Sequence, residues 1–137
     1  MTDPSDKETA PQRFALLVED EALVAMVAEE SLRIIGFEPV SVRTAGEALK
    51  ILGEAVAPSL AVIDVGLPDI RGDELAARAR VMAPNMPIIV ASGYDEVELN
   101  RKFAADPTTA VLSKPYSDRD LARAVIALGL EVIEEDV

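Results

Sequence analysis

The most informative segment of this 137-residue chain is Leu60-Ala-Val-Ile-Asp-Val-Gly-Leu-Pro-Asp-Ile-Arg-Gly72. Its continuous apolar run, residues 60–63, leads directly into the carboxylate of Asp64 and then into a loop that Pro68 and Gly72 shape. Uninterrupted apolar runs of this kind are typical of strands that are buried on both faces of a parallel sheet. The segment therefore predicts a central parallel strand with an acidic side chain at its carboxyl end.

Four other short apolar runs complete the set, at residues 14–18, 39–42, 88–91 and 110–112. Three of them are continuous, like the first, and we expect them to be buried in the same way. The run at 39–42 alternates and begins with Pro39, which has no N–H for a sheet hydrogen bond. Because proline is found mainly on edge strands, we expect this run at an edge of the sheet.

Helical patterns separate the five runs. They cover residues 21–35, a segment from Thr44, a segment from Gly72 or Asp73 to before Pro84, residues 95–104, and a segment from Ser117. Alternating strands and helices predict an α/β fold with a doubly wound, five-stranded parallel sheet and right-handed crossovers. In such sheets ligands bind at the carboxyl ends of the strands.

The first predicted helix has more apolar residues than one buried face needs. We expect the core to be faced by Val24, Val27, Ala28, Ser31 and Ile35, which leaves Leu23 and Met26 outside it. An apolar patch on a helix is either a docking site for a partner or is partly covered by neighbouring loops. Both alternatives stay open at this stage.

The composition excludes several classes of site. The chain has no histidine and no cysteine, so it can have no Ser-His-Asp or Cys-His catalysis, no disulfide, and no zinc or haem held by these residues. Its formal net charge of −12 repels phosphate backbones and anionic lipids, so we expect no direct binding of nucleic acid or membrane. The lack of cysteine and of an apolar targeting segment predicts a cytoplasmic protein.

Polar side chains stand at four of the five predicted strand ends, and they are Glu19, Asp20, Asp64, Ser92 and Lys114. Neighbouring carboxylates cannot all stay ionised without compensation, which Mg²⁺ and Lys114 can provide. A cation, a lysine and a hydroxyl around one aspartate can stabilise a transferring phosphoryl group. Asp64 would then be the nucleophile.

Four blocks of the sequence resemble the signature of the response-regulator receiver domain, and they are Phe14-Ala-Leu-Leu-Val-Glu-Asp-Glu21, the segment 60–72, Pro87-Ile-Ile-Val-Ala-Ser-Gly93 and Leu112-Ser-Lys-Pro115. The resemblance implies a flavodoxin-like (βα)5 fold with strand order 2-1-3-4-5. It also implies a function in two-component signalling or a phosphorelay, in which a phosphoryl group passes from phospho-histidine to the chain with Mg²⁺ and switches a partner interaction.

The resemblance further implies which residues hold the metal and accept the phosphoryl group. Asp64 is the phosphoacceptor and a metal ligand. Asp20 binds Mg²⁺ directly, and Glu19 helps directly or through water. The carbonyl of Gly66 completes the protein ligands.

By the same resemblance, Lys114 pairs with a phosphoryl oxygen and Ser92 donates a hydrogen bond to the phosphoryl group. The Lys114–Pro115 peptide bond would be cis. The chain departs from many family members at Val111, where they have an aromatic residue that reports phosphorylation. We expect the loop after Ser92 to carry more of the switch, with Tyr94 as a substitute for the aromatic residue.

For the organisation of the chain we expect a mobile N-terminal tail at residues 1–12, a receiver domain at 13–131 and an acidic C-terminal end at 132–137. Without an effector domain, output would pass to an unknown downstream protein. The phosphodonor would be a histidine kinase or a histidine phosphotransfer protein, and the chain would be a monomer or a weak homodimer. It would not be an enzyme in the usual sense, because it would catalyse only its own phosphorylation and dephosphorylation.

Three alternatives compete with this interpretation. A degenerate receiver would bind partners without ever carrying phosphate. An aspartyl phosphohydrolase would need an acid/base aspartate two residues after the nucleophile, where Gly66 stands instead. A dinucleotide-binding fold is disfavoured because no Gly-x-Gly-x-x-Gly follows the first strand.

Overall fold

A computed structural model describes residues 13–133 of the chain. The predicted N-terminal tail, residues 1–12, and residues 134–137 of the predicted acidic end lie outside the described residues. The elements in chain order are β1 (Phe14–Val18), α2 (Ala22–Ile34), β2 (Glu38–Val42), α3 (Ala45–Leu52), β3 (Leu60–Asp64), α4 (Gly72–Met82), β4 (Ile88–Ser92), α5 (Glu96–Lys102), β5 (Thr109–Ser113) and α6 (Asp118–Ala127).

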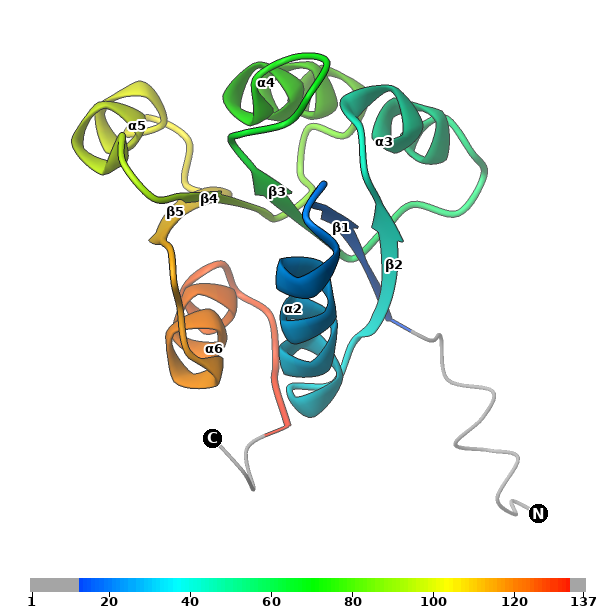
Figure 1. Cartoon of the computed structure of the whole chain (residues 1–137), viewed down its shortest axis with the longest axis vertical. Helices are drawn as coiled ribbons and strands as arrows, with labels where there is room; N and C mark the ends of the chain where they lie inside the picture. Colours follow the sequence, from blue (N-terminus) through cyan, green and yellow to red (C-terminus); the bar gives the residue numbers. More distant parts are fainter. Residues whose placement is uncertain (1–12, 134–137) are drawn as a thin grey trace.

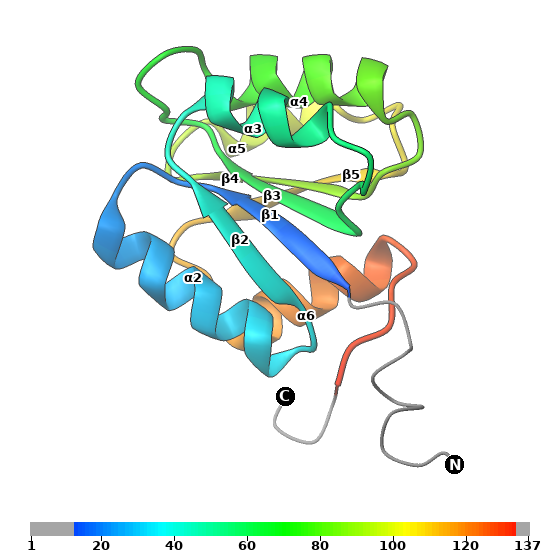
Figure 2. The ribbon, with the colours of Figure 1, turned by 90° about the vertical axis from the view of Figure 1, so that its right-hand side faces the viewer.

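The five strands form one parallel sheet in the order β2-β1-β3-β4-β5, which confirms the predicted fold and strand order. Helices α3, α4 and α5 cover one face, and α2 and α6 cover the other (Figures 1 and 2). The strand at Pro39 is an edge strand, as predicted. The continuous apolar run of β5 predicted burial on both faces. Strand β5 is only partly buried, because it forms the edge of the sheet opposite β2.

The central strands β1, β3 and β4 place successive side chains in two separate cores. Leu16, Ala61 and Ile63 pack under α3 and α4, whereas Leu17 and Val62 pack against α2 and α6. Because helices cover both faces, neither set meets water, and this explains why the runs are apolar at every position. The same alternation determines toward which face of the sheet each side chain at the carboxyl edge is directed.

Helix α2 is rotated relative to the prediction. Ala28 is buried as predicted, but the helix also buries Ala25 and Leu32, whereas Val27 is 66% exposed. The small alanines let the helix pack closely on the sheet, and this contact directs Val27 outward. The predicted burial of Val27 was therefore wrong, although Ser31 is buried as expected.

An arginine fastens α4 to the amino edge of the sheet, far from the carboxyl ends. The Arg80 guanidinium donates to four backbone carbonyls, to the Thr109 hydroxyl and to Asp106. The Asp106 carboxylate also accepts hydrogen bonds from Thr108 and Thr109. These contacts clip the start of β5 to the end of α4.

No helix among residues 13–133 is both long enough and apolar enough to cross a membrane.

Candidate functional site

The parallel strands bring three charged side chains together at the carboxyl edge of the sheet. Glu19 follows β1, Asp64 ends β3, and Lys114 follows β5. The Lys114 ammonium donates to Asp64 Oδ1 at 2.7 Å and to Glu19 Oε1 at 3.2 Å. A lysine 50 residues away from one partner and 95 from the other is thus shared between two carboxylates.

Three carboxylates form a set of oxygen donors. Glu19, Asp20 and Asp64 each present one carboxylate oxygen, and these atoms lie within 4.8 Å of one another. The remaining oxygens are oriented by the backbone, because Glu21 N–H donates to Glu19 Oε2 and Gly66 N–H donates to Asp64 Oδ2, each at 3.1 Å. A donor set made of oxygen alone fits a hard ion such as Mg²⁺.

The electrostatics of the cluster favour a cation. Burial raises the pKa of Glu19, and the charge of Asp64 adds to this effect, while the Glu21 amide and Lys114 oppose it. Burial also acts against the charge of Lys114, but the hydrogen bond and the charge of Asp64, with a contribution from Glu19, outweigh it and raise the pKa of Lys114. Lys114 is therefore charged at neutral pH, and the acids still exceed it in number.

Ser92 lies at the end of β4 in the same pocket as Asp64 and Lys114, a cleft of about 650 Å³. Its side chain is 4% exposed. Its Oγ accepts hydrogen bonds from the N–H groups of Tyr94, at 3.1 Å, and Asp95, at 3.2 Å. The hydroxyl proton remains available for donation, since both of these contacts use oxygen lone pairs.

The backbone around the site is closely packed. Gly72 N–H donates to Val65 O, and a Cβ added at Gly72 would overlap the carbonyl of Asp64, so this position needs glycine. The Lys114–Pro115 bond is cis, which confirms the expectation from the resemblance.

The position at which the chain departs from many family members, Val111, and its expected substitute, Tyr94, differ in their surroundings. Val111 is partly buried and packs against the core under α3 and α4. The side chain of Tyr94 is 92% exposed at the mouth of the pocket. Its role as a substitute for the aromatic residue stays a prediction.

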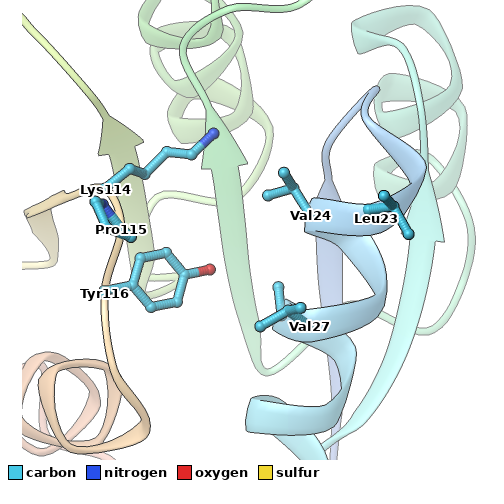
Figure 3. A pocket seen from close by; sticks show the side chains of 7 residues that line it. Leu23, Val24, Val27, Lys114, Pro115 and Tyr116 are labelled. Carbon is cyan, nitrogen blue, oxygen red and sulfur yellow. The ribbon is translucent and has the colours of Figure 1, made fainter.

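An apolar groove of about 510 Å³ adjoins the pocket. It is lined by Leu23, Val24, Val27 and Ala28 of α2 and by Lys114, Pro115 and Tyr116. Figure 3 shows Tyr116 with its hydroxyl toward α2, and Lys114 extending toward the carboxyl end of β3. Burial raises the pKa of Tyr116 to about 12, so this side chain is neutral and suits an apolar wall.

Sequence reasoning missed a second polar network beside the pocket. Arg71, the residue before α4, pairs with Asp73 and with Asp95, and Lys102 pairs with Asp73. The available signal was the residue type at Arg71, because helices usually begin with Ser, Thr, Asp or Asn at that position. Arg71 makes no side-chain cap and is free to reach across the loop.

Comparisons with known proteins agree with this geometry. The family model of the response regulator receiver domain matches residues 15–126. The transcriptional regulatory protein PdtaR of Mycobacterium tuberculosis is 33% identical over 127 residues, which are 91% of this chain and 61% of PdtaR. The response regulator receiver protein CpdR of Brucella abortus is 31% identical over 110 residues, which are 80% of this chain and 91% of CpdR.

A solved structure has the same architecture. The CheY-like receiver domain protein of Methanospirillum hungatei JF-1 superimposes with a TM-score of 0.74 at 30% identity, covering 85% of this chain and 92% of its own. The family match spans most of the described residues and includes the acidic strand ends and the shared lysine. The chain therefore belongs to the response regulator receiver domain family, whose members are signalling modules of two-component systems.

Proposed function

We propose that this chain accepts a phosphoryl group from phospho-histidine onto Asp64, in a reaction that needs Mg²⁺, and that the phosphorylated chain changes its interaction with a downstream protein. The observation that carries the proposal is the shared ion pair of Lys114 with Asp64 and Glu19 beside a third carboxylate. Burial of neighbouring charges lowers the stability of the folded state, and a function in binding a phosphoryl group accounts for their presence.

In the proposed reaction, a carboxylate oxygen of Asp64 attacks phosphorus while the P–N bond of the donor breaks. The electron pair of that bond stays on the histidine nitrogen, and an acyl phosphate forms on Asp64. Lys114 exchanges its resting hydrogen bond to Asp64 for one to a phosphoryl oxygen. The Ser92 hydroxyl donates to another phosphoryl oxygen.

Glu19, Asp20, Asp64 and the carbonyl of Gly66 would hold the Mg²⁺ ion. When bound, Mg²⁺ neutralises charge on the phosphoryl oxygens. Later attack by water on phosphorus returns the free carboxylate and releases inorganic phosphate. The chain would thus catalyse its own phosphorylation and dephosphorylation and turn over no external phosphoester.

The groove between α2 and the segment after β5 would receive the phosphodonor. Its wall is apolar, and it shares Lys114 with the phosphoacceptor pocket. A helix of a histidine kinase or histidine phosphotransfer protein lying on Leu23 and Val27 would bring a histidine to the pocket. This proposal selects the docking alternative for the exposed apolar residues of α2, which include Leu23 at 76% and Met26 at 61% exposure.

We take residues 13–131 as the receiver unit that performs this reaction. The proposed compartment is the cytoplasm, where histidine kinases present their phosphorylated domains.

Acetyl phosphate, a small donor, tests the chemistry without a partner. Incubation with Mg²⁺ should add about 80 Da to the intact mass, as one phosphoryl group does. The gain should disappear with EDTA and in Asp64→Asn. The matched control is Glu54→Gln, which removes an exposed carboxylate that does not line the pocket and should leave the gain unchanged. An unmodified wild-type mass at millimolar Mg²⁺ would indicate the degenerate alternative.

A pair of surface variants tests the groove. Val27→Asp puts a charge into the groove, and Val97→Asp puts the same charge on α5, where the valine is 73% exposed. We expect Val27→Asp to slow transfer from a phosphorylated histidine kinase while phosphorylation by acetyl phosphate stays normal. Val97→Asp should leave both rates unchanged. Equal transfer rates for the two variants would exclude the groove as the docking site.

A further inference from the structure

Helix α5 is held to the body of the domain by few apolar contacts. It has seven residues, of which only Leu99 is buried. Val97 is 73% exposed. In Figure 1 the helix lies over the β4–β5 side of the sheet, away from the α3–α4 pair. A helix with so little buried surface needs other contacts to define its position.

Ion pairs from the start of α4 supply those contacts at both ends of α5. At one end, the Arg71 guanidinium lies 3.2 Å from Asp95, the residue that precedes the helix. At the other end, Lys102 Nζ lies 2.8 Å from Asp73 Oδ2. Asp73 is 8% exposed and also holds Arg71 Nε at 2.9 Å. The two ends of α5 are therefore fastened to neighbouring positions of one other helix.

We call the Arg71–Asp95 and Lys102–Asp73 pairs the clamp, and its Asp95 end borders the phosphoacceptor pocket. Arg71, Asp95 and Asp64 line the same cleft. The backbone N–H of Asp95 is held by Ser92 Oγ, and its carboxylate is held by Arg71. Two groups that face the pocket thus restrain the residue at which α5 begins.

We propose that Arg71 is a positioning residue that couples phosphorylation of Asp64 to the placement of α5. The proposal rests on the proposed function. Phosphorylation replaces the single negative charge of the Asp64 carboxylate with the charge of an acyl phosphate, which is close to two, and places that charge on oxygens that reach into the cleft. These oxygens attract the Arg71 guanidinium away from Asp95. Ser92, drawn toward the same group, gives up the Asp95 amide. The start of α5 is then released while the Asp73–Lys102 pair keeps its end in place.

The coupling has a defined signature in hydrogen exchange. In the wild-type chain, phosphorylation should speed exchange of the amides of residues 94–102. Arg71→Gln removes the charge that holds Asp95 and should speed the same amides without phosphorylation, by about two- to fivefold, the range of one partly exposed ion pair. In this variant phosphorylation should add little further change.

The experiment is hydrogen exchange with mass spectrometry on the full chain, with and without acetyl phosphate and Mg²⁺, with intact mass recorded on the same samples. Arg71→Lys retains the charge and should restore most of the wild-type response. The matched control is Arg78→Gln on the same helix, which breaks only the exposed pair with Glu74 and should exchange as wild type.

The three results that would contradict the proposal lead to different conclusions. A wild-type chain that gains no phosphoryl mass overturns the proposed function and the coupling with it. A phosphorylated Arg71→Gln chain with the full wild-type change in α5 overturns the coupling alone. Unphosphorylated Arg71→Gln with wild-type exchange shows that the clamp does not hold α5, and this also overturns the coupling.

Discussion

Replacing Lys114 with methionine removes the only positive charge that bonds to both Asp64 and Glu19 among the described residues, while it keeps most of the side-chain volume. The two carboxylates then face each other and Asp20 without a cation. The structure therefore predicts a loss of folding stability at neutral pH.

The size of the loss follows from distance and burial. At an effective dielectric constant of about 20, charges 2.7 and 3.2 Å apart attract by roughly 6 and 5 kcal/mol. Desolvation offsets most of this attraction in the intact pair, but removing one partner of a buried pair costs about 3–5 kcal/mol. Since the Lys114 side chain is 22% exposed, we expect about 2–3 kcal/mol for Lys114→Met at pH 7.

The loss should depend on pH in a defined direction. Burial already raises the pKa of Glu19 above 4.5, so Glu19 favours the folded state below that value and opposes it as pH rises through its raised pKa. Without Lys114, two influences that lower this pKa disappear. The free energy of unfolding of Lys114→Met should therefore fall furthest below that of wild type at pH 7. This deficit should become smaller as pH falls toward 4.5.

Urea unfolding followed by circular dichroism measures both effects. The control is Lys50→Met on α3, an exposed lysine, for which we expect a change within about 0.5 kcal/mol. If Lys114→Met were as stable as wild type at pH 7, or if its deficit were equal at pH 7 and pH 4.5, the electrostatic description of the site would be wrong.

Three more substitutions probe other parts of the structure. Arg80→Met removes the guanidinium that clips α4 to β5 and should lower the free energy of unfolding by about 2–3 kcal/mol, because several acceptors lose a charged donor; an unchanged urea midpoint would contradict the clip. Burial acts to raise the pKa of Asp106, but hydrogen bonds from Thr109, Thr108 and Arg80 hold this pKa well below 3.8. The Asp106 carboxylate therefore stabilises the fold above pH 3.8, and this contribution is lost as pH falls through the lowered pKa. Asp106→Asn should thus destabilise the chain at pH 7 and match wild type in strong acid, which acid titrations of the two proteins would compare. Asp20→Asn should lower the affinity for Mg²⁺ about tenfold or more in calorimetric titration, since an anionic oxygen ligand becomes a neutral one. Equal affinities of the variant and wild type would exclude Asp20 from the metal site.

The sequence was sufficient for the fold because the apolar runs and the acids at their ends carry independent information. Burial on both faces required continuous runs, and parallel strands required their ends to meet, so the approach of Asp64 and Lys114 could be expected before any coordinates. The exposure of Val27 could not, because helical periodicity puts both Val27 and Ala28 at core spacing and does not say that only the smaller Ala28 is buried. The pairing of Arg71 also depends on where a neighbouring loop lies, which local sequence does not encode.

Chemical mapping of the phosphorylated residue would examine the phosphoacceptor assignment itself. Borohydride reduces an acyl phosphate to an alcohol, so peptide sequencing by mass spectrometry after phosphorylation and reduction identifies the modified carboxyl group. We predict that homoserine appears at position 64 and at no other acidic position, and only when Mg²⁺ was present. Modification at Asp20, at Asp69 or at any other carboxylate in place of Asp64 would contradict the proposed chemistry.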